Sequence, residues 1–563
     1  MCCPVLGKAF PCQLKDTKLS AMKDRYPIWK TSGWTFGVLL VLPILAIFYT
    51  ALGESDQVFA HLMSTVMGTY TLNTLVLVAG TALLAALFGL PAAWFMAMCR
   101  LPGEKWLQWA LVLPLAMPGY IIGYIYTDWF DYAGPVQILL RDWFGWQSYQ
   151  DYWFPDIRTL GGACLVLALV LYPYIYLLAR TAFMEQSASL LQSARLLRCS
   201  PLESFRRISL PLARPSIAVG LSLIAMETLG DFGTVSYFAV HSLTTAVYDT
   251  WLGYSNLNAA AKISAMMLLA IFLLISAERF SRRRQKLFQQ HSEPNEDIRY
   301  RLSGWKKWLA LSWCWGLIGF AFLLPLLQLL YYAWQYFADS WNSAFRQFSI
   351  NSLIVSVSAA LLAVAVALLV NFYHRLDGRR SSIAPMRLSV MGYAVPGTVL
   401  AIGVMIPLTT ADHWLNDLAR YMDWGRPGLF FSGTVFAMIF AFVVRFGAVA
   451  VGSIESSLAK IPPSLDMAAK TMGCGPMSML RRVHLPLIRR GCLIAGLLVF
   501  IESMKELNAA LLLRPFNFET LATYVFNYAS DEQLELAAMP AILLVLVGLV
   551  PLVVVNRSLE QSH

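Results

Sequence analysis

Charged residues are scarce in this sequence. Asp, Glu, Lys and Arg make up 13% of its 563 residues, whereas hydrophobic residues make up 58%, and the mean hydropathy is +0.58. Water-soluble domains carry about 25% charged residues and about 45–50% apolar residues. The composition therefore excludes an ordinary soluble protein, and we expect the lipid bilayer to be the solvent for most of the chain.

Motifs of several other protein classes are missing. The sequence has no G-x-x-x-x-G-K-[ST] loop, so it cannot cradle ATP phosphates in that way, and the absence of H-E-x-x-H and G-x-S-x-G gives no support to a membrane-embedded enzyme. Its nine Cys residues lack zinc-site spacing, so we assign no metal site and place Cys2, Cys3 and Cys12 in a cytoplasmic tail. The beginning of the chain is polar and basic, and we expect no cleavable signal peptide.

Twelve segments are apolar enough, and approximately long enough, to cross a bilayer as helices, which takes about 20 residues each. The sequence therefore predicts an all-α polytopic membrane protein. The predicted spans are 33–52, 71–98, 107–127, 160–179, 216–240, 259–277, 308–333, 349–373, 387–409, 428–444, 491–513 and 535–555.

The excess of basic residues follows the membrane topology. The formal net charge is +10, but most of the 43 Lys and Arg residues fall in alternate connections between the predicted spans. Basic connections stay in the cytoplasm, so we expect both termini to be cytoplasmic. No nucleic-acid-binding motif accompanies these residues, so we expect no nucleic-acid partner. The cluster Arg282-Arg283-Arg284 is interpreted as a stop-transfer signal.

The second half of the chain repeats the first. Near-constant offsets over some 150 residues are typical of a duplicated unit. Because each half has six predicted spans, the repeats are parallel, with a two-fold axis along the membrane normal. The matching segments are Asn73-Thr74-Leu75 with Asn351-Ser352-Leu353 and Pro118-Gly119 with Pro396-Gly397, both at an offset of 278, and 206–212 with 481–487 and Glu227 with Glu502, both at 275.

The repeat and the charge pattern divide the chain into segments. Two six-helix membrane units flank a charged connection, and each unit contains one long basic loop. The predicted segments are a cytoplasmic tail 1–31, a first transmembrane unit 32–277 with its loop 185–214, a cytoplasmic linker 278–307, a second transmembrane unit 308–556 with its loop 455–490, and a cytoplasmic tail 557–563.

These two long loops share one design. The second contains L-D-M-A-A-K-T-M-G-C-G-P over 465–476 and ends in V-H-L-P over 483–486; the first contains L-L-Q-S-A-R-L-L-R-C-S-P over 190–201 and ends in I-S-L-P over 208–211. Both resemble the EAA loop of ABC importer permeases. The first loop departs from that pattern, with Gln192 in place of the acid and Arg198 in place of the glycine.

The resemblance implies that each loop docks a coupling helix on a separate ABC ATPase, present in two copies. This chain would bind no cofactor, because its partner uses the ATP. Small residues suit such a docking element, glycine allows a chain reversal after it, and Pro201 and Pro476 suit the first turn of the helix that follows. The coupling residues so implied are Gln192, Ser193, Ala194, Leu210, Pro211, Asp466, Ala468, Ala469, Gly473, Leu485 and Pro486.

Six charged residues lie well inside the predicted spans, and five of them, all except Lys262, are in the fifth and eleventh spans. Such residues are costly in a bilayer and indicate a function. Glu502 and Glu506 are four residues apart, so we expect them to share one helix face. They line a translocation pathway or stabilise packing, with Lys505 or Lys262 neutralising a carboxylate. The candidate pathway residues are Glu227, Asp231, Glu502, Lys505 and Glu506.

The stretch E-T-L-G-D-F-G-T-V-S-Y-F over 227–238 resembles the ferric-ion permeases of this family, which also fuse two halves. The resemblance implies an inner-membrane permease that receives Fe(III) from a periplasmic binding protein. His61, His241 and His413, in predicted outside loops, are interpreted as solvated side chains or as residues that receive metal. The alternatives are the same architecture with thiamine, sulfate or phosphonate as cargo, and an ion-coupled secondary transporter.

Overall fold

The fold is almost entirely helical. The computed structural model describes residues 26–53, 57–187, 192–193, 196–197, 200–283 and 299–560, without the side chains of 277–283 and 551–560. Cys2, Cys3, Cys12, Ala194, Arg198 and Arg284 lie outside the described residues. The two short strands in the described part, β1 (Cys99–Arg100) and β2 (Tyr300–Arg301), pair in parallel and hold the end of the linker against the first half.

Ten helices of the described chain are long and apolar enough to cross a membrane, and a pair bent by 90° at Glu104–Ala116 and Gly119–Phe144 makes eleven. A shorter apolar helix covers Leu534–Val550. Seven of the ten carry one label each: α2 (Pro27–Ala51), α4 (Met67–Met98), α8 (Leu160–Met184), α14 (Leu257–Arg283), α18 (Ser343–Asp377), α20 (Gly397–Tyr421) and α21 (Val435–Ala459). The other three are each made of three consecutive labelled parts. Pro201–Gly230 contains α10 (Pro201–Ser204), η3 (Phe205–Ser209) and α11 (Leu210–Gly230); Trp305–Gln335 contains α15 (Trp305–Ile318), η6 (Gly319–Leu323) and α16 (Leu324–Gln335); Pro476–Lys505 contains α23 (Pro476–Met479), η9 (Leu480–His484) and α24 (Leu485–Lys505).

Shorter helices connect them. They are α3 (Gln57–Thr65), α5 (Glu104–Ala110), η1 (Leu113–Ala116), α6 (Gly119–Phe130), α7 (Pro135–Phe144), η2 (Tyr149–Asp151), α12 (Gly233–Tyr237), α13 (Leu243–Tyr248), η4 (Asp249–Gly253), α17 (Phe337–Ser340), η7 (Arg380–Ser382), α19 (Ile383–Ser389), η8 (Met391–Ala394), α22 (Pro463–Thr471), α25 (Asn508–Leu513) and α26 (Leu521–Ser530), and α27 (Leu534–Glu560) ends the described chain.

Five predicted spans differ from the observed helices. Segments 107–127 and 387–409 are interrupted, because α5 ends at Ala110 before α6 begins at Gly119, and α19 ends at Ser389 before α20 begins at Gly397. Segments 216–240 and 491–513 are not continuous helices, because α11 ends at Gly230 and α24 ends at Lys505. Segment 428–444 belongs to a longer helix, α21, which runs on to Ala459 and places Arg445 in its middle. A charged residue inside an otherwise apolar helix therefore set the predicted boundary too early.

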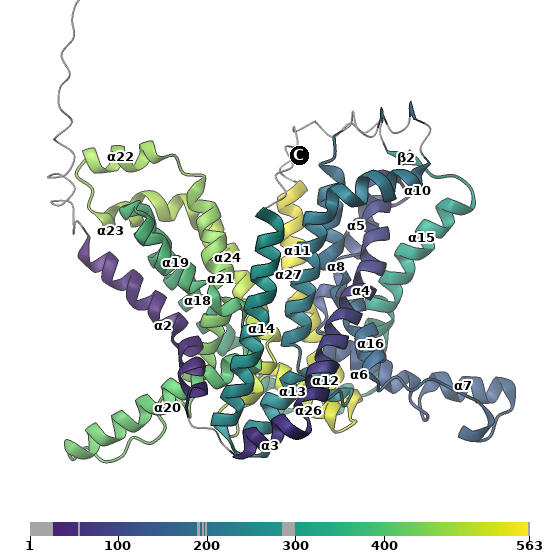
Figure 1. Ribbon diagram of the computed structural model, residues 1–563, viewed down its shortest axis with the longest axis horizontal. Coiled ribbons are helices and arrows are strands. Elements are labelled where there is room, and N and C mark those ends of the chain that lie inside the picture. The colour runs from purple at the N-terminus through teal and green to yellow at the C-terminus, as the bar shows by residue number, and fades with distance from the viewer. Residues whose placement is uncertain are drawn as a thin grey trace, which may run out of the picture.

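The helices form two lobes that converge at the end with α13 and α26 and diverge at the end with α10 and α22 (Figure 1). The start of α2 also lies at the divergent end. Both long loops of the repeat therefore lie at the same end of the bundle, as the parallel repeat requires.

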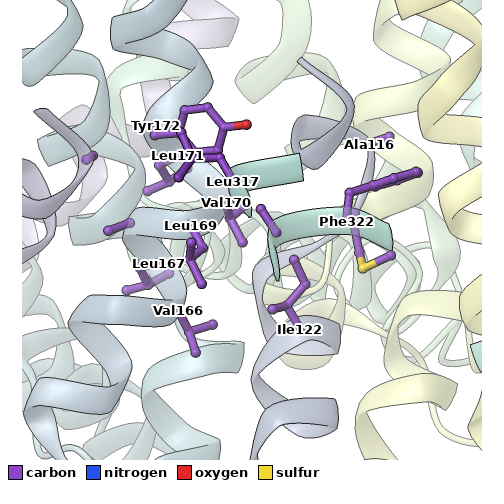
Figure 2. Close-up of a cluster of buried hydrophobic side chains, with 14 of the residues drawn as sticks. Ala116, Ile122, Val166, Leu167, Leu169, Val170, Leu171, Tyr172, Leu317 and Phe322 are labelled. Carbon is purple, nitrogen blue, oxygen red and sulfur yellow. The ribbon is translucent and has the colours of Figure 1, made fainter. Parts of the chain in front are cut away.

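The two lobes do not coincide with the two sequence halves. One hydrophobic core joins residues 77–240 to 310–345 and 504–545, and the other joins 40–67 and 243–271 to 355–513. Figure 2 shows this exchange, with Leu317 of the second half beside Val170 of α8 and Phe322 of the second half in the same cluster. Likewise α2 packs against α18, α19 and α20. Each lobe therefore needs helices from both halves to bury its apolar surface.

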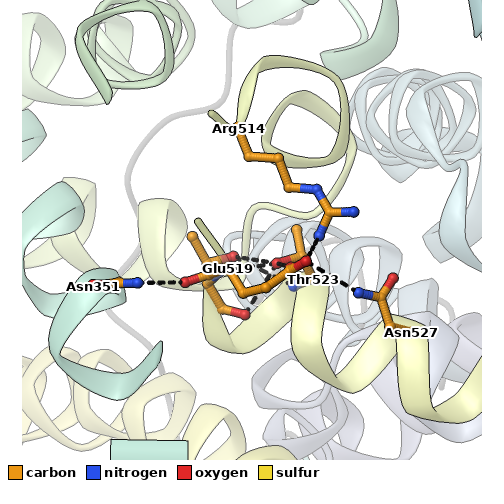
Figure 3. A network of polar contacts seen from close by, with 6 residues as sticks. Asn351, Arg514, Glu519, Thr523 and Asn527 are labelled. Atoms are coloured by element: carbon orange, nitrogen blue, oxygen red, sulfur yellow. Dashed lines mark hydrogen bonds and ion pairs between the residues drawn. The ribbon is translucent and has the colours of Figure 1, made fainter. Parts of the chain in front are cut away.

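The repeat is visible in individual hydrogen bonds. The Asn73 amide donates to the carbonyl oxygen of His241 at 3.0 Å, and the Asn351 amide donates to that of Glu519 at 3.1 Å. In the second half Glu519 also accepts a hydrogen bond from Thr523 and pairs with Arg514 (Figure 3). The Asn73 and Asn351 hydrogen bonds are equivalent, one in each half, and therefore support the duplication. The residue that supplies the carbonyl oxygen is a histidine in the first half and a glutamate in the second.

Helices α4 and α8 pack closely at a glycine. A Cβ atom on Gly89 would lie 2.9 Å from the carbonyl oxygen of Tyr172 and 2.3 Å from Cγ2 of Ile175. Gly316 of α15, in contrast, has nothing within 4 Å of that position. The small residue at position 89 therefore allows the two helices to touch.

We expect Gly89→Ala to destabilise the protein by about 1–3 kcal/mol, the usual cost of overpacking. Thermal unfolding in detergent measures this effect. Gly316→Ala is the matched control and should be neutral or stabilising by about 0.5–1 kcal/mol, because alanine favours the helix. Equal effects of the two substitutions would contradict the close packing of α4 on α8.

Candidate functional site

The five candidate pathway residues predicted from the sequence line one cavity of about 170 Å³. The cavity lies where α11 and α24, the equivalent helices of the two halves, come to an end. Its wall is completed by the Pro118-Gly119 segment, which the second half repeats as Pro396-Gly397, and by aromatic side chains. The lining residues are Pro118, Gly119, Tyr120, Glu227, Gly230, Asp231, Tyr393, Arg445, Phe446, Glu502, Lys505, Glu506, Leu507 and Asn508.

Asp231 stabilises the break after α11. It follows the last helical residue with φ −72° and ψ 127°, so the chain leaves the helix there. Its carboxylate accepts hydrogen bonds from the backbone N–H groups of Thr234 at 3.0 Å and Val235 at 3.2 Å. Backbone groups at membrane depth must be satisfied within the protein, and Asp231 does this for the start of α12.

Glu506 has the same position in the second half. It follows α24 with φ −70° and ψ 110°, accepts a hydrogen bond from the N–H of Ala509 at 3.0 Å, and forms an ion pair with Arg445 at 2.7 Å. The prediction that Glu502 and Glu506 share one helix face is wrong, because the helix ends between them. Glu506 is buried, whereas Glu502 is exposed.

The cation beside Glu506 is Arg445, which sequence reasoning missed. We placed it in a cytoplasmic loop because the predicted tenth span was too short. The expected partner Lys262 instead lies over the ring of Phe59 at 5.4 Å. Lys505 contacts the carbonyl oxygen of Leu115 at 3.3 Å. An arginine inside an apolar run was the signal that could have located this pair.

Gly397 makes room for the pair. A Cβ atom at this position would lie 2.3 Å from Nη1 of Arg445 and 2.5 Å from Oε1 of Glu506. The repeated Pro-Gly dipeptide therefore starts α20 against the cavity without covering the buried charges.

Glu227 and Glu502 differ from the two capping acids. They are equivalent in the repeat, and neither makes a hydrogen bond or ion pair within the described residues. Glu227 is half-buried and lies within electrostatic range of Arg445 and Glu502. Among the described residues no group of three or more His, Cys, Asp and Glu side chains is arranged to hold a metal ion. The cavity thus presents one uncommitted carboxylate from each half and no resident metal site.

The second long loop forms a short exposed helix, α22, at the divergent end of the bundle (Figure 1). Leu465, Ala468 and Met472 are exposed and lie three to four residues apart, so they share one face. Ala469 is 1% exposed and packs against the chain's own core. Gly473 follows the helix with φ +75°, which allows the chain reversal expected there.

A charged triad ties α22 to the membrane helices. Asp466 accepts hydrogen bonds from Nε of Arg375 at 2.8 Å and from Nε2 of His484 at 2.7 Å. Arg375 also donates to the carbonyl oxygens of Leu458 and Ile461. Because Arg375 belongs to α18 and His484 precedes α24, the triad links α22 to two helices of its lobe.

The first long loop is built differently. Gln192 and Ser193 are helical and exposed. Where the second half has His484, the first half has Ser209. The Ser209 hydroxyl donates a hydrogen bond to the neutral side chain of Gln186 at 2.9 Å, whereas His484 contacts the charged Asp466. Pro201 and Pro476 begin α10 and α23, as predicted. Leu210 and Pro211 start α11, and Leu485 and Pro486 start α24.

Comparison with known proteins places the chain in a transporter family. Residues 85–286 and 359–562 each match the family described as binding-protein-dependent transport system inner membrane component. The two matches cover more than half of the chain and both halves of the repeat. The chain belongs to this family of multi-pass inner-membrane permeases.

Three relatives indicate its place within that family. The chain is 27% identical to the Fe(3+)-transport system permease protein FbpB 2 of Haemophilus influenzae, over 95% of this chain and 99% of that protein. It is 21% identical to the ferric transport system permease protein FbpB of Actinobacillus pleuropneumoniae, over 77% and 63%. It is 32% identical to the molybdenum transport system permease protein ModB of Escherichia coli, over 34% and 86%.

We expect Asp466→Asn to loosen α22, because the substitution removes the charge that both Arg375 and His484 contact. Hydrogen bonds to charged groups contribute about 1.5–3 kcal/mol each. Limited proteolysis at the 460–475 segment measures the loosening. Asp417→Asn is the control, since Asp417 forms an exposed ion pair with Arg420 at 3.7 Å and should leave proteolysis unchanged. Wild-type resistance in Asp466→Asn would contradict the anchoring role of the triad.

Proposed function

We propose that this chain is the membrane-spanning permease of an ABC importer that passes Fe(III) from a periplasmic binding protein to the cytoplasm. The observation that supports this cargo is the end-to-end similarity to FbpB 2, which covers 95% of this chain and both of its fused halves. The two ATPase copies bind at the end of the bundle that carries α10 and α22, and both chain termini lie on that cytoplasmic side.

The cavity chemistry is compatible with a hard cation in transit. Carboxylate oxygens are the ligands that hard cations prefer, and Glu227 and Glu502 supply one from each half. A permeation site binds weakly enough for its cargo to leave, as in channels. Two uncommitted carboxylates suit transit better than a closed ligand cage.

The broken spans provide the moving parts. When the ATPases close on ATP, they draw the two coupling segments together and reorient the lobes about the cavity. The triad around Asp466 carries this displacement into α18 and α24. The carboxylates that cap α12 and α25 keep the backbone satisfied in the middle of the membrane while the lobes move.

The relatives named for molybdenum and sulfate transport favour a second cargo class, an oxyanion. Lys505 and Arg445 line the same cavity, but Arg445 is neutralised by Glu506. Uptake of radiolabelled molybdate or sulfate, competed by an excess of the unlabelled anion, separates the two classes. Only an oxyanion importer shows such uptake and its inhibition.

We expect Glu227→Gln with Glu502→Gln to lower the initial rate of radiolabelled Fe(III) uptake by roughly tenfold, equivalent to about 1.4 kcal/mol. The amides keep the size of the side chains and remove the charge. Glu455→Gln on α21, an exposed residue outside the cavity, is the control and should leave uptake unchanged. Wild-type uptake by the double variant, at equal protein level, would refute the role of these carboxylates.

We expect Ala468→Arg to abolish transport-coupled ATP hydrolysis, because a long cation on the exposed face of α22 blocks the approach of the ATPase. Ala468→Ser keeps the side chain small and should retain activity. Hydrolysis and uptake are measured on the assembled complex. A substitution at position 469 does not test docking, because the Ala469 side chain is buried in the chain's own core. Full coupling in Ala468→Arg would exclude α22 as the docking helix.

A further inference from the structure

Two side arms project from opposite lobes near the end of the bundle away from α10 and α22 (Figure 1). The first arm, residues 132–154, contains α7, and the second arm, residues 411–434, contains the far end of α20. Positions 135–144 and 413–422 are related by the 278-residue offset of the repeat. The arms are therefore one feature that occurs twice.

The first arm has some of its polar groups turned inward. Gln137 is buried, donates to the carbonyl oxygen of Phe130 at 2.8 Å and accepts from the Tyr152 hydroxyl at 2.6 Å. Arg141 donates to the carbonyl oxygen of Tyr132 at 2.9 Å. The exposed side chains include many large apolar or aromatic ones, with Trp143 80% exposed, beside the polar residues Asp142, Gln147, Gln150 and Asp151. The large apolar or aromatic ones are Ile138, Leu139, Trp143, Phe144, Tyr149 and Trp153.

The second arm has the same pattern. Asp412 is fully buried and accepts hydrogen bonds from the N–H groups of Phe431 at 2.7 Å and Ser432 at 2.8 Å. Asn416 closes the turn through two hydrogen bonds with Gly428, at 2.8 and 3.0 Å. Large apolar or aromatic side chains are again exposed: Trp414, Leu418, Tyr421, Trp424 and Phe430. They alternate with the exposed polar residues His413, Asp417, Arg420, Asp423 and Arg426.

Water does not favour the exposure of so many aromatic and apolar side chains. A hydrated arm would bury its apolar groups and expose Gln137, Asp412 and Asn416. The hydrocarbon core is equally unsuitable, because Asp142, Asp417 and Arg420 are exposed on the same arms. Trp and Tyr with a few charges are favoured at the boundary between lipid headgroups and acyl chains.

The direction of the arms favours a lipid surface over a protein partner. They extend sideways, away from each other and from the middle of the bundle (Figure 1). A partner seated over the middle of this end would not cover both arms, whereas a bilayer surrounds the bundle and meets both. Both arms also join membrane spans directly, α7 through α6 and the second arm through α20 and α21.

We propose that the two arms lie in the headgroup region of the leaflet opposite the coupling segments and anchor each lobe there. Each lobe is then held at one end by lipid while its other end, with α10 or α22, is free to move with a partner. The anchors act as pivots for the divergence and convergence of the lobes. This inference does not depend on the cargo.

The test is photocrosslinking in native membranes, with p-benzoylphenylalanine in place of Trp143 or Trp414 in the full chain. An aromatic residue replaces an exposed aromatic residue, so folding should be preserved. The expected result is a mass increase equal to one phospholipid at both positions. The control is Met472, which is 74% exposed on the coupling segment and should give no lipid adduct.

Two outcomes would overturn the proposal. One is an adduct at positions 143 and 414 with a polypeptide, such as a binding protein, and without lipid. The other is no adduct at these positions in membranes where position 472 crosslinks to its own partner. Iron uptake by the same labelled variants shows separately whether the transporter is intact, so a failed anchor and a failed cargo assignment are distinguishable.

Discussion

The requirement to satisfy every backbone polar group at membrane depth governs the centre of this molecule. Helices α11 and α24 both end there, and each break exposes N–H groups at the start of the next short helix. Asp231 and Glu506 accept hydrogen bonds from those groups. Because these acids are committed to the backbone, Glu227 and Glu502 are the two cavity carboxylates that make no hydrogen bond or ion pair among the described residues.

Much of the fold followed from the sequence. Composition and run length predicted the membrane helices, and the constant offsets predicted the repeat, which recurs in the paired Asn73 and Asn351 hydrogen bonds. The exchange of helices between lobes was not predictable, because hydropathy shows that a segment needs an apolar partner but not which one. The packing of α2 on α18 to α20, and of Leu317 and Phe322 in the core of the first half, reveals that choice.

The candidate site was predicted in its residues but not in their roles. The rule that residues four apart share a face assumed an unbroken helix and therefore grouped Glu502 with Glu506. A charged residue ends a run of apolar residues in a hydropathy scan, so Arg445 was assigned to a loop, although it lies in the middle of α21. Likewise, two neighbouring alanines looked equivalent, yet Ala468 is exposed and Ala469 is buried, because adjacent positions on a helix point in different directions.

The central claim is that Glu227 and Glu502 face a water-filled passage between the halves rather than lipid. It is tested most directly by thiol labelling in a chain whose nine natural cysteines are replaced, with cysteine introduced at position 227 or 502. The account predicts reaction with a membrane-impermeant maleimide in inside-out vesicles at both positions. Reaction only with a lipid-soluble maleimide would contradict it, because these side chains would then face the bilayer.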